Sequence, residues 1–171
     1  MNYLIIIFGK FISWVSSTFN MGNGSTWPGH IALKVNPNFI KDILKKSQTK
    51  VIIVTGTNGK TTTARLITSI VRENNKTYLQ NKAGANLLNG LASALIKGAG
   101  MNGELTKDYL IFESDENALP KVLEQTNPGF IICINLFRDQ LDRYGEINSI
   151  AKKWHEAFKK LSNETVLILN A

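Results

Sequence analysis

The chain of 171 residues contains a single cysteine, Cys133. One thiol can form neither an internal disulfide nor a four-cysteine zinc site, so both are excluded. Cys133 lies within an apolar run, where a cysteine is typically a small buried hydrophobic residue rather than a ligand. A chain without disulfides suits a reducing compartment, and we therefore expect a cytoplasmic protein.

The apolar N-terminal stretch, residues 1–19, lacks the form of a membrane span. A spanning helix needs about 20 mostly apolar residues, and Gly9 and Lys10 interrupt this stretch halfway. It also lacks the charged start and the small-residue cleavage site of a signal peptide. Two alternatives stay open: a helix packed on the protein body, or a helix lying in the membrane interface. The second would make the protein peripheral at the inner face of the membrane.

Acidic residues are in the minority, since 20 Lys and Arg against 13 Asp and Glu give a net charge of +7. An excess of positive charge indicates an anionic partner. No basic run interleaves with aromatic residues as nucleic-acid binders often show, so we expect no nucleic-acid partner. A nucleotide, a phosphorylated lipid and the inner membrane surface would each fit the charge, which does not choose among them.

The clearest motif in the chain is Thr55-Gly-Thr-Asn-Gly-Lys-Thr-Thr62, which follows an apolar run and precedes a helical pattern. Flexible glycines and helix-start N–H groups form a pocket for phosphate oxygens. Lys60 would reach the β- and γ-phosphates, and the Thr61 hydroxyl would hold Mg²⁺. The general pattern has its first glycine at residue 54, where this chain has Val54; the alternative is a plain Gly/Asn turn. The predicted phosphate-binding residues are Gly56, Thr57, Asn58, Gly59, Lys60, Thr61 and Thr62.

Strand and helix patterns alternate from residue 50 onward. The predicted strands are 51–54, 77–80, 109–112, 130–134 and 166–169, and the predicted helices are 61–74, 85–97, 117–125 and 147–161. This alternation predicts an α/β fold of the P-loop type, a parallel sheet flanked by helices that binds ligands at the carboxyl ends of its strands. Residues 50–171 would form this domain. Residues 1–49 would hold the apolar helix, a loop over 21–29 and a short helix capped by Asn36.

Three further sites lie at or just after predicted strands. Glu113 directly follows strand 109–112, where a carboxylate facing the phosphate loop would bind Mg²⁺; considered alone, it would more simply be a helix cap or first-turn acid. Asn86 enters a helix after a strand and also fits a simple cap. The loop 135–146 gathers so many polar groups that a binding site is favoured over an ion-paired connector.

Two histidines and two tryptophans are expected to have no part in chemistry. His155 lies on the polar face of helix 147–161 and is predicted to be solvated, while His30 lies in a loop without an evident partner. Trp14 and Trp154 are predicted to be packing residues.

Taken together, the polar motifs resemble those of the Mur ligase family. The segment 55–62 is similar to that family's variant phosphate loop, which also accounts for Val54. Gly84-Ala-Asn86 resembles the motif that carries an active-site asparagine, Glu113 matches the Mg²⁺-binding glutamate, and 135–144 resembles a motif of an asparagine followed by Asp-His-Leu-Asp. The resemblance implies the central ATPase domain of a Mur ligase.

The resemblance also implies roles for single residues. Lys60 and Glu113 would be catalytic, Thr61 and Glu113 would hold Mg²⁺, and Asn86 and Asn135 would contact the nucleotide. Gln140 stands where the family has a histidine that helps to hold a second metal, so that role is not carried over. Lys152 loosely matches a lysine that is carbamylated in many members.

Within the family the similarity is to the MurT-type branch, through the apolar N-terminus and the segments 28–34, 84–90 and 135–146. Its members use ATP and Mg²⁺ to amidate the D-glutamate α-carboxylate of lipid II through an acyl-phosphate, with ammonia from a GatD-type glutaminase. The resemblance therefore implies a carbon–nitrogen ligase of peptidoglycan synthesis, with lipid II and a glutaminase as partners. Such proteins continue with a zinc ribbon and a ligase domain, so we expect a fragment, inactive alone, with zinc only downstream.

Two alternatives remain open. The first is another ATP-dependent carboxylate–amine ligase, such as a peptide-adding Mur ligase or a folylpolyglutamate synthase. The second is a nucleotide-binding fragment without turnover.

Overall fold

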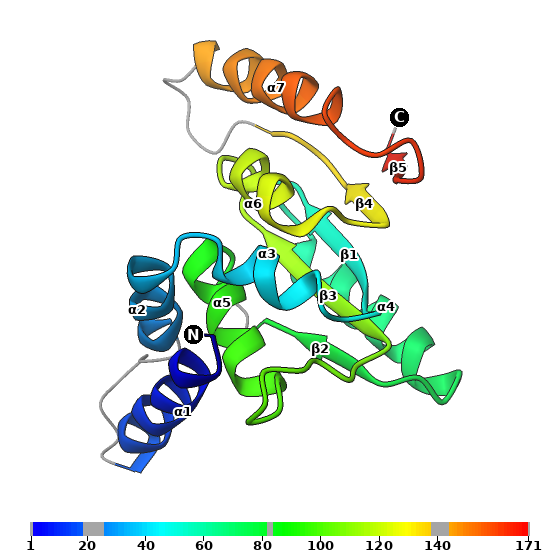
Figure 1. Ribbon diagram of the computed structural model, residues 1–171. Helices are drawn as coiled ribbons and strands as arrows, with labels where there is room; N and C mark the ends of the chain where they lie inside the picture. The colour runs from blue at the N-terminus through cyan, green and yellow to red at the C-terminus, as the bar shows by residue number, and fades with distance from the viewer. Residues whose placement is uncertain (1, 19–25, 82–83, 138–143, 171) are drawn as a thin grey trace.

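The computed structural model describes residues 2–18, 26–81, 84–137 and 144–170 (Figure 1). In chain order the elements are α1 (Asn2–Thr18), α2 (Trp27–Val35), α3 (Phe39–Leu44), β1 (Lys50–Thr55), α4 (Lys60–Glu73), β2 (Tyr78–Gln80), α5 (Leu88–Gly98), β3 (Tyr109–Ser114), α6 (Leu119–Thr126), β4 (Phe130–Cys133), α7 (Tyr144–Phe158) and β5 (Val166–Leu169). The predicted alternation of strands and helices from residue 50 onward is confirmed.

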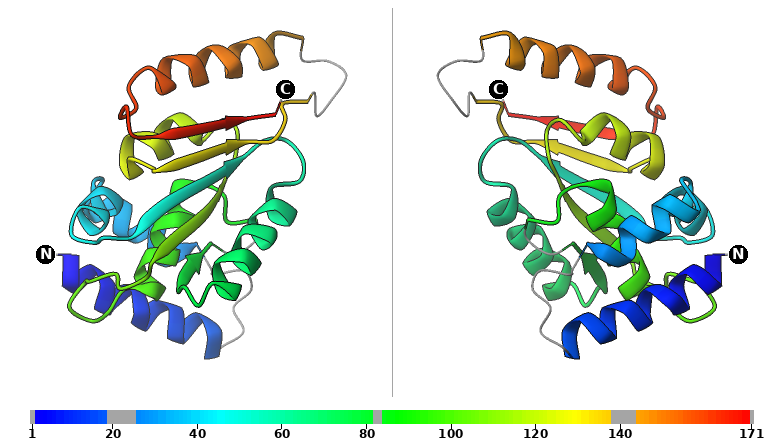
Figure 2. Two further views of the ribbon diagram at one scale, coloured as in Figure 1. Left: turned by 90° about the vertical axis from the view of Figure 1, so that its right-hand side faces the viewer. Right: turned by 90° about the vertical axis from the view of Figure 1, so that its left-hand side faces the viewer.

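The five strands form one parallel sheet in the order β2-β3-β1-β4-β5, and Figure 2 shows them running the same way. The central strand β1 is buried from Val51 to Thr55, which is why its sequence is a continuous apolar run. Along β1, Val54 lies opposite Glu113 of β3, and Thr55 lies opposite Cys133 of β4. The carboxyl ends of these three strands therefore meet at one edge, and the predicted α/β fold is confirmed.

Helices cover both faces of the sheet. On one face, Ala64 and Val71 of α4 pack with Ile52, Val54 and Ile111. On the other face, residues of α3, α5, α6 and α7 form the larger core with inward-facing strand residues such as Leu110, Phe112 and Ile131. Because α4 follows the phosphate loop directly, its packing on the sheet fixes where that loop lies.

The N-terminal helices share this larger core. Ile6 of α1, Ala32 of α2 and Phe39 of α3 are fully buried within it. Helix α2 crosses α5 closely at Gly29, whose N–H donates to the Ser93 hydroxyl at 2.8 Å. The division of the chain between residues 49 and 50 stays a prediction.

Two predictions about the N-terminal segment are wrong. Helix α2 begins at Trp27, inside the predicted loop, because Pro28 is compatible with a first helical turn and Gly29 lets α2 approach α5. His30 therefore lies in a helix, with its ring 6.5 Å from that of Trp27. Asn36 also ends α2, since its N–H donates to Ala32 O at 2.8 Å. Its Oδ1 accepts from the Asn38 N–H at 3.0 Å, in the turn that leads into α3, but α3 itself starts only at Phe39.

The two tryptophans expected to pack differ in the structure. Trp154 is buried on α7, and its indole N–H donates to the Glu116 carbonyl at 2.8 Å, which confirms the prediction. Trp14 is 60% exposed on α1, so the prediction that it packs is wrong. His155 is exposed on α7, as expected. Among the described residues, no helix has the length and apolar character needed to cross a membrane.

Candidate functional site

The loop between β1 and α4 needs both of its glycines. Gly56 has φ +142° and Gly59 has φ +85°, backbone conformations that favour glycine. A Cβ on Gly56 would also lie 2.8 Å from the carbonyl oxygen of Asn135. The loop therefore lies directly against the chain that leaves β4, and Gly59 turns it into the first turn of α4.

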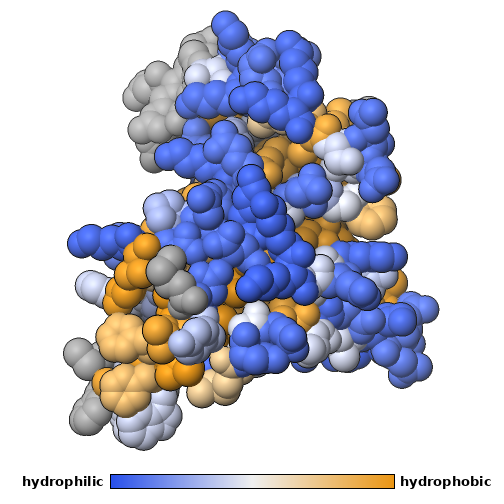
Figure 3. All heavy atoms as spheres, viewed as in Figure 1, coloured by the Kyte–Doolittle hydropathy of each residue, from blue (hydrophilic) through white to orange (hydrophobic). Residues whose placement is uncertain are grey.

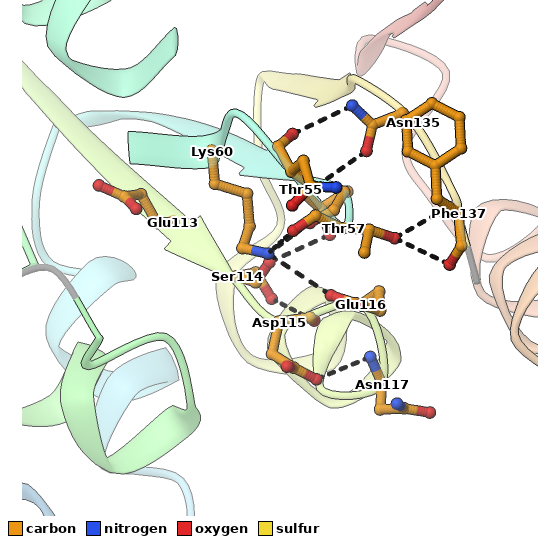
Figure 4. A network of polar contacts seen from close by, with 12 residues as sticks. Thr55, Thr57, Lys60, Glu113, Ser114, Asp115, Glu116, Asn117, Asn135 and Phe137 are labelled. Carbon is orange, nitrogen blue, oxygen red and sulfur yellow. Dashed lines mark hydrogen bonds and ion pairs between the residues drawn. The ribbon is translucent and has the colours of Figure 1, made fainter. Parts of the chain in front are cut away.

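Asn135 holds this loop from the side of β4. Its Oδ1 accepts from the N–H of Asn58 at 3.0 Å, and its Nδ2 donates to the Asn58 carbonyl at 3.0 Å. Beside it, the Thr57 hydroxyl accepts from the Phe137 N–H at 3.0 Å and donates to the Phe137 carbonyl at 3.3 Å (Figure 4). Two reciprocal pairs thus fix the backbone of the loop, and the structure gives Asn135 a positioning contact that its predicted nucleotide role did not include.

Lys60 lies at the start of α4 with its ammonium directed back over the loop (Figure 4). Its Nζ donates to the carbonyls of Gly56 and Thr57, the latter at 3.0 Å. It also lies 3.6 Å from Oε2 of Glu116, and both side chains are largely buried. The cationic group is therefore held at the mouth of the loop, where helix-start N–H groups favour an anion.

Thr61 and Glu113 form the direct link between α4 and β3. The Thr61 hydroxyl donates to Oε2 of Glu113 at 2.7 Å, and Nε2 of Gln80 donates to the other carboxylate oxygen at 3.2 Å. Only 3% of the Glu113 surface is exposed. The two residues that the sequence predicts as magnesium ligands are thus in contact, on neighbouring elements at the carboxyl edge of the sheet.

Asn81 fixes the backbone of Glu113. Its Oδ1 accepts from the Glu113 N–H at 2.9 Å, and its Nδ2 donates to the carbonyls of Glu113 at 3.0 Å and Ala85 at 2.8 Å. Asn81 directly follows the last residue of β2, so its side chain continues the pairing with β3 beyond the end of that strand. Neither Gln80 nor Asn81 was predicted, although two polar residues ending a strand at this edge were a visible signal.

The capping alternative for Glu113 is excluded by its neighbour Asp115. Asp115 accepts the Asn117 N–H on its side chain at 2.9 Å and the Leu119 N–H on its carbonyl at 3.0 Å, so Asp115 organises the start of α6. Glu113 lies within β3 and contacts Thr61 instead. The carboxylate of Glu113 is therefore available to the site.

Thr61 and Glu113 offer oxygen atoms, the type of ligand atom that a magnesium ion prefers. Mg²⁺ prefers oxygen ligands and is typically bound through one or two carboxylates, with water and substrate phosphates completing its shell. Within the described part of the chain, no group of three or more His, Cys, Asp or Glu side chains is arranged to hold a metal.

The remaining predicted residues are Asn86, Lys152 and Gln140, and they lie at different places relative to Thr61 and Glu113. The Asn86 carbonyl accepts from the Asp115 N–H at 3.0 Å, so the segment after β2 lies beside the end of β3. Lys152 is exposed on α7 and lines a groove of about 600 Å³ between α6 and α7 together with Lys121 and Lys153. Its carbamylation stays a prediction. Gln140 and residues 138–143 of the polar loop lie outside the described residues.

Residues 54–171 match the Mur ligase middle domain family. Over 148 residues the chain is 33% identical to "Lipid II isoglutaminyl synthase (glutamine-hydrolyzing) subunit MurT" of Streptococcus pneumoniae, and over 149 residues it is 35% identical to the protein of that name from Staphylococcus aureus. Each match covers 86% of this chain and 32% of the relative, so the chain spans about a third of their length.

The fold is also similar to solved structures of Mur ligases. One is the MurF ligase of Thermotoga maritima in complex with ADP, with a TM-score of 0.64 at 18% sequence identity. That likeness covers 83% of this chain and 32% of the other. At this level of identity it shows the shared fold.

Proposed function

The chain belongs to the Mur ligase family. We propose that it supplies the part of a lipid II isoglutaminyl synthase that binds ATP and uses it to activate a carboxylate. The observation that carries the nucleotide half of this proposal is the 2.7 Å contact between the Thr61 hydroxyl and the Glu113 carboxylate, beside the loop that holds Lys60. The choice of acceptor rests on the similarity to MurT subunits over 86% of the chain.

In the proposed reaction, an α-carboxylate oxygen of D-glutamate attacks the γ-phosphorus of ATP, and ADP leaves. Ammonia then attacks the acyl carbon, inorganic phosphate leaves, and the nitrogen loses a proton to give the D-isoglutamine amide. The ammonia would come from a GatD-type glutaminase. The two steps give a balanced carboxylate-to-amide conversion at the expense of one ATP.

Each part of the site has a task in the first step. The loop N–H groups and Lys60 would bind the β- and γ-phosphates and offset the charge on the transferred phosphoryl group. Thr61 and Glu113 would hold Mg²⁺, which neutralises phosphate charge when bound. Gln80 holds the Glu113 carboxylate, Asn81 holds the Glu113 backbone, and Asn135 holds the backbone of the loop. Asn86, whose carbonyl accepts from the Asp115 N–H just after β3, would contact the nucleotide.

The test combines the full-length protein with lipid II, ATP, Mg²⁺, glutamine and the glutaminase, and follows the stem peptide by mass spectrometry. Conversion of the acid to the amide only when the glutaminase is present is the expected result. Addition of an amino acid without the glutaminase would instead identify a peptide-adding ligase. ATP binding without turnover in the complete mixture would identify a binding module. Lys60→Met is the matched variant expected to lose the reaction while it remains folded.

Because lipid II is membrane-linked and the proposed reaction uses ATP, the reaction would take place on the cytoplasmic side, at the inner face of the membrane.

A further inference from the structure

Helix α1 presents an apolar face to solvent. The exposed residues from 3 to 14 are all aliphatic or aromatic, with exposed fractions from 40% to 60%: Tyr3, Leu4, Ile7, Phe8, Phe11 and Trp14. Their spacing of three and four residues puts them on one side of the helix. We call these six residues the α1 apolar face. Figure 3 shows apolar side chains gathered over α1, whereas much of the remaining surface in that view is hydrophilic.

The opposite side of α1 is anchored in the protein. Ile6 is fully buried, and a Cβ on Gly9 would lie 2.9 Å from the Ile96 side chain of α5. A surface helix normally buries its apolar stripe and turns charged residues to water. In α1, one apolar stripe is buried against the core, and a second apolar stripe faces solvent. Such a face marks an interaction site rather than ordinary surface.

The charges around this face fit an anionic surface. Helix α1 packs against α2 and α5, and these three helices contain three lysines, Lys10, Lys34 and Lys97, and neither Asp nor Glu. Lys10 lies between Phe8 and Phe11 in the sequence of α1, and its Nζ donates to the Lys97 carbonyl of α5 at 3.4 Å. The nearby acid Asp42 accepts hydrogen bonds from Asn36 at 2.9 Å and Asn2 at 3.4 Å, at the start of α1.

The side chains of the α1 apolar face are those that membrane interfaces favour. Trp and Tyr are enriched at the headgroup level, where an apolar ring with a polar atom suits both environments. Helices that lie in the interface combine Trp, Phe and Leu on one side with Lys on the other. Trp14 and Phe11 are also in ring contact, with centroids 6.1 Å apart, so they form one aromatic surface.

We propose that α1 lies in the interface of an anionic lipid bilayer, with the α1 apolar face inserted among the acyl chains and headgroups. The choice of a bilayer over a protein rests in part on the proposed function, because that function has a lipid-linked acceptor. The α1 apolar face, and the presence of lysines without Asp or Glu in α1, α2 and α5, are independent of that function. The helix would then anchor the protein to the membrane in one orientation, because its buried side packs against the core.

The test is flotation of the purified protein with vesicles of equal parts phosphatidylglycerol and phosphatidylcholine, and with pure phosphatidylcholine. We expect binding to the anionic vesicles, and at least a tenfold loss of the partition coefficient in the variant Phe8→Gln/Phe11→Gln/Trp14→Gln. Deletion of α1 is unsuitable, because it would expose the core around Ile6. Circular dichroism and thermal melting establish that the variant is folded.

The matched control replaces three exposed apolar residues elsewhere, in Leu66→Gln/Ile70→Gln/Met101→Gln. This variant should bind the anionic vesicles as the unaltered protein does. Equal loss in both variants, or no vesicle binding by the unaltered protein, overturns the proposal. Concentration-dependent self-association that only the α1 variant loses, without vesicle binding, would show an interface between copies and would also overturn it.

A second measurement locates the contact. In Trp27→Phe/Trp154→Phe, Trp14 is the remaining tryptophan, and brominated lipids should quench its fluorescence. Unchanged fluorescence would contradict insertion. Neither measurement uses ATP, lipid II or the glutaminase, so a failure of the proposed reaction and a failure of the membrane contact are distinguishable.

Discussion

The side-chain amide of Asn81 bonds to the backbone of Glu113 in both directions, accepting from its N–H at 2.9 Å and donating to its carbonyl at 3.0 Å. Both residues are buried. The amide thus takes the place of one more residue of β2 and holds the end of β3 in line. Glu113, the proposed magnesium ligand, is thus positioned by Asn81, a residue with no proposed catalytic or ligand role.

Replacing Asn81 by Leu should therefore affect both stability and the site. The backbone N–H and C=O of Glu113 would lose their partners in a buried setting, which should lower the free energy of unfolding by about 2 kcal/mol or more. Urea unfolding measures this change in stability. Because the Glu113 carboxylate would also be less well positioned, the Mg²⁺ concentration that half-saturates nucleotide binding should rise. Asn74→Ala removes an exposed amide at the end of α4 as a control and should stay within about 0.5 kcal/mol. An unchanged Mg²⁺ requirement in a folded Asn81 variant would refute the positioning role.

The contact between Thr61 and Glu113 predicts a magnesium-specific defect. Thr61→Val keeps the shape of the side chain and removes the hydroxyl, so nucleotide affinity in the presence of Mg²⁺ should fall about tenfold, equivalent to about 1.4 kcal/mol. Affinity measured with a chelator present should change little. Titration calorimetry with ADP under both conditions gives the comparison. Thr63→Val, two positions further along α4, is the matched control; an equal loss with and without Mg²⁺ would point to a damaged loop instead.

Much of the site was predictable because it depends on strong local signals. The apolar run of β1 and the glycines after it identify the loop, and Glu113 follows from the rule that parallel strands end at one edge. The pairing of Asn135 with Asn58 was not predictable, since it requires knowing that β4 lies beside β1. Asn81 was missed for a similar reason, because the residue that it holds, Glu113 of β3, lies 32 residues later in the chain.

The N-terminal segment was harder to predict because tertiary packing overrides its local signals. Pro28-Gly29 is a typical loop sequence, yet Gly29 is buried where α2 crosses α5. For α1, the apolar composition indicated a helix against either the protein or a membrane. Nearly every side of this helix is apolar, so composition could not indicate that one stripe is buried and another exposed.

The crossing of α2 and α5 predicts that Gly29→Ala is strongly destabilising. A Cβ there would lie 1.9 Å from the Asn89 carbonyl oxygen and 2.6 Å from the Ser93 nitrogen, both backbone atoms. The helices would have to move apart, and overpacking of this kind costs about 1–3 kcal/mol. Gly129→Ala is the control, because its Cβ would meet only the Val51 carbonyl at 3.8 Å. Equal thermal melting temperatures for the two variants would contradict the close crossing.

The buried thiol of Cys133, at the end of β4, should react with alkylating reagents mainly after the protein unfolds. Burial raises its pKa to about 11 from an ordinary value of 9.0, so at pH 8 the folded protein should carry a protonated thiol. The thiolate is the reactive form, and alkylation by iodoacetamide should therefore be slow in buffer and fast in urea. Mass spectrometry of the alkylated chain gives both rates.

The same shift predicts how stability changes with pH. Above pH 9 the cysteine of the unfolded chain loses its proton, while that of the folded protein keeps it until about pH 11. The unfolded state then binds fewer protons, so the stability that is present below pH 9 should decline as the pH rises toward 11. In Cys133→Ala this part of the decline should disappear, although the smaller side chain lowers stability at every pH. A decline of the same size in both proteins would show that other groups cause it.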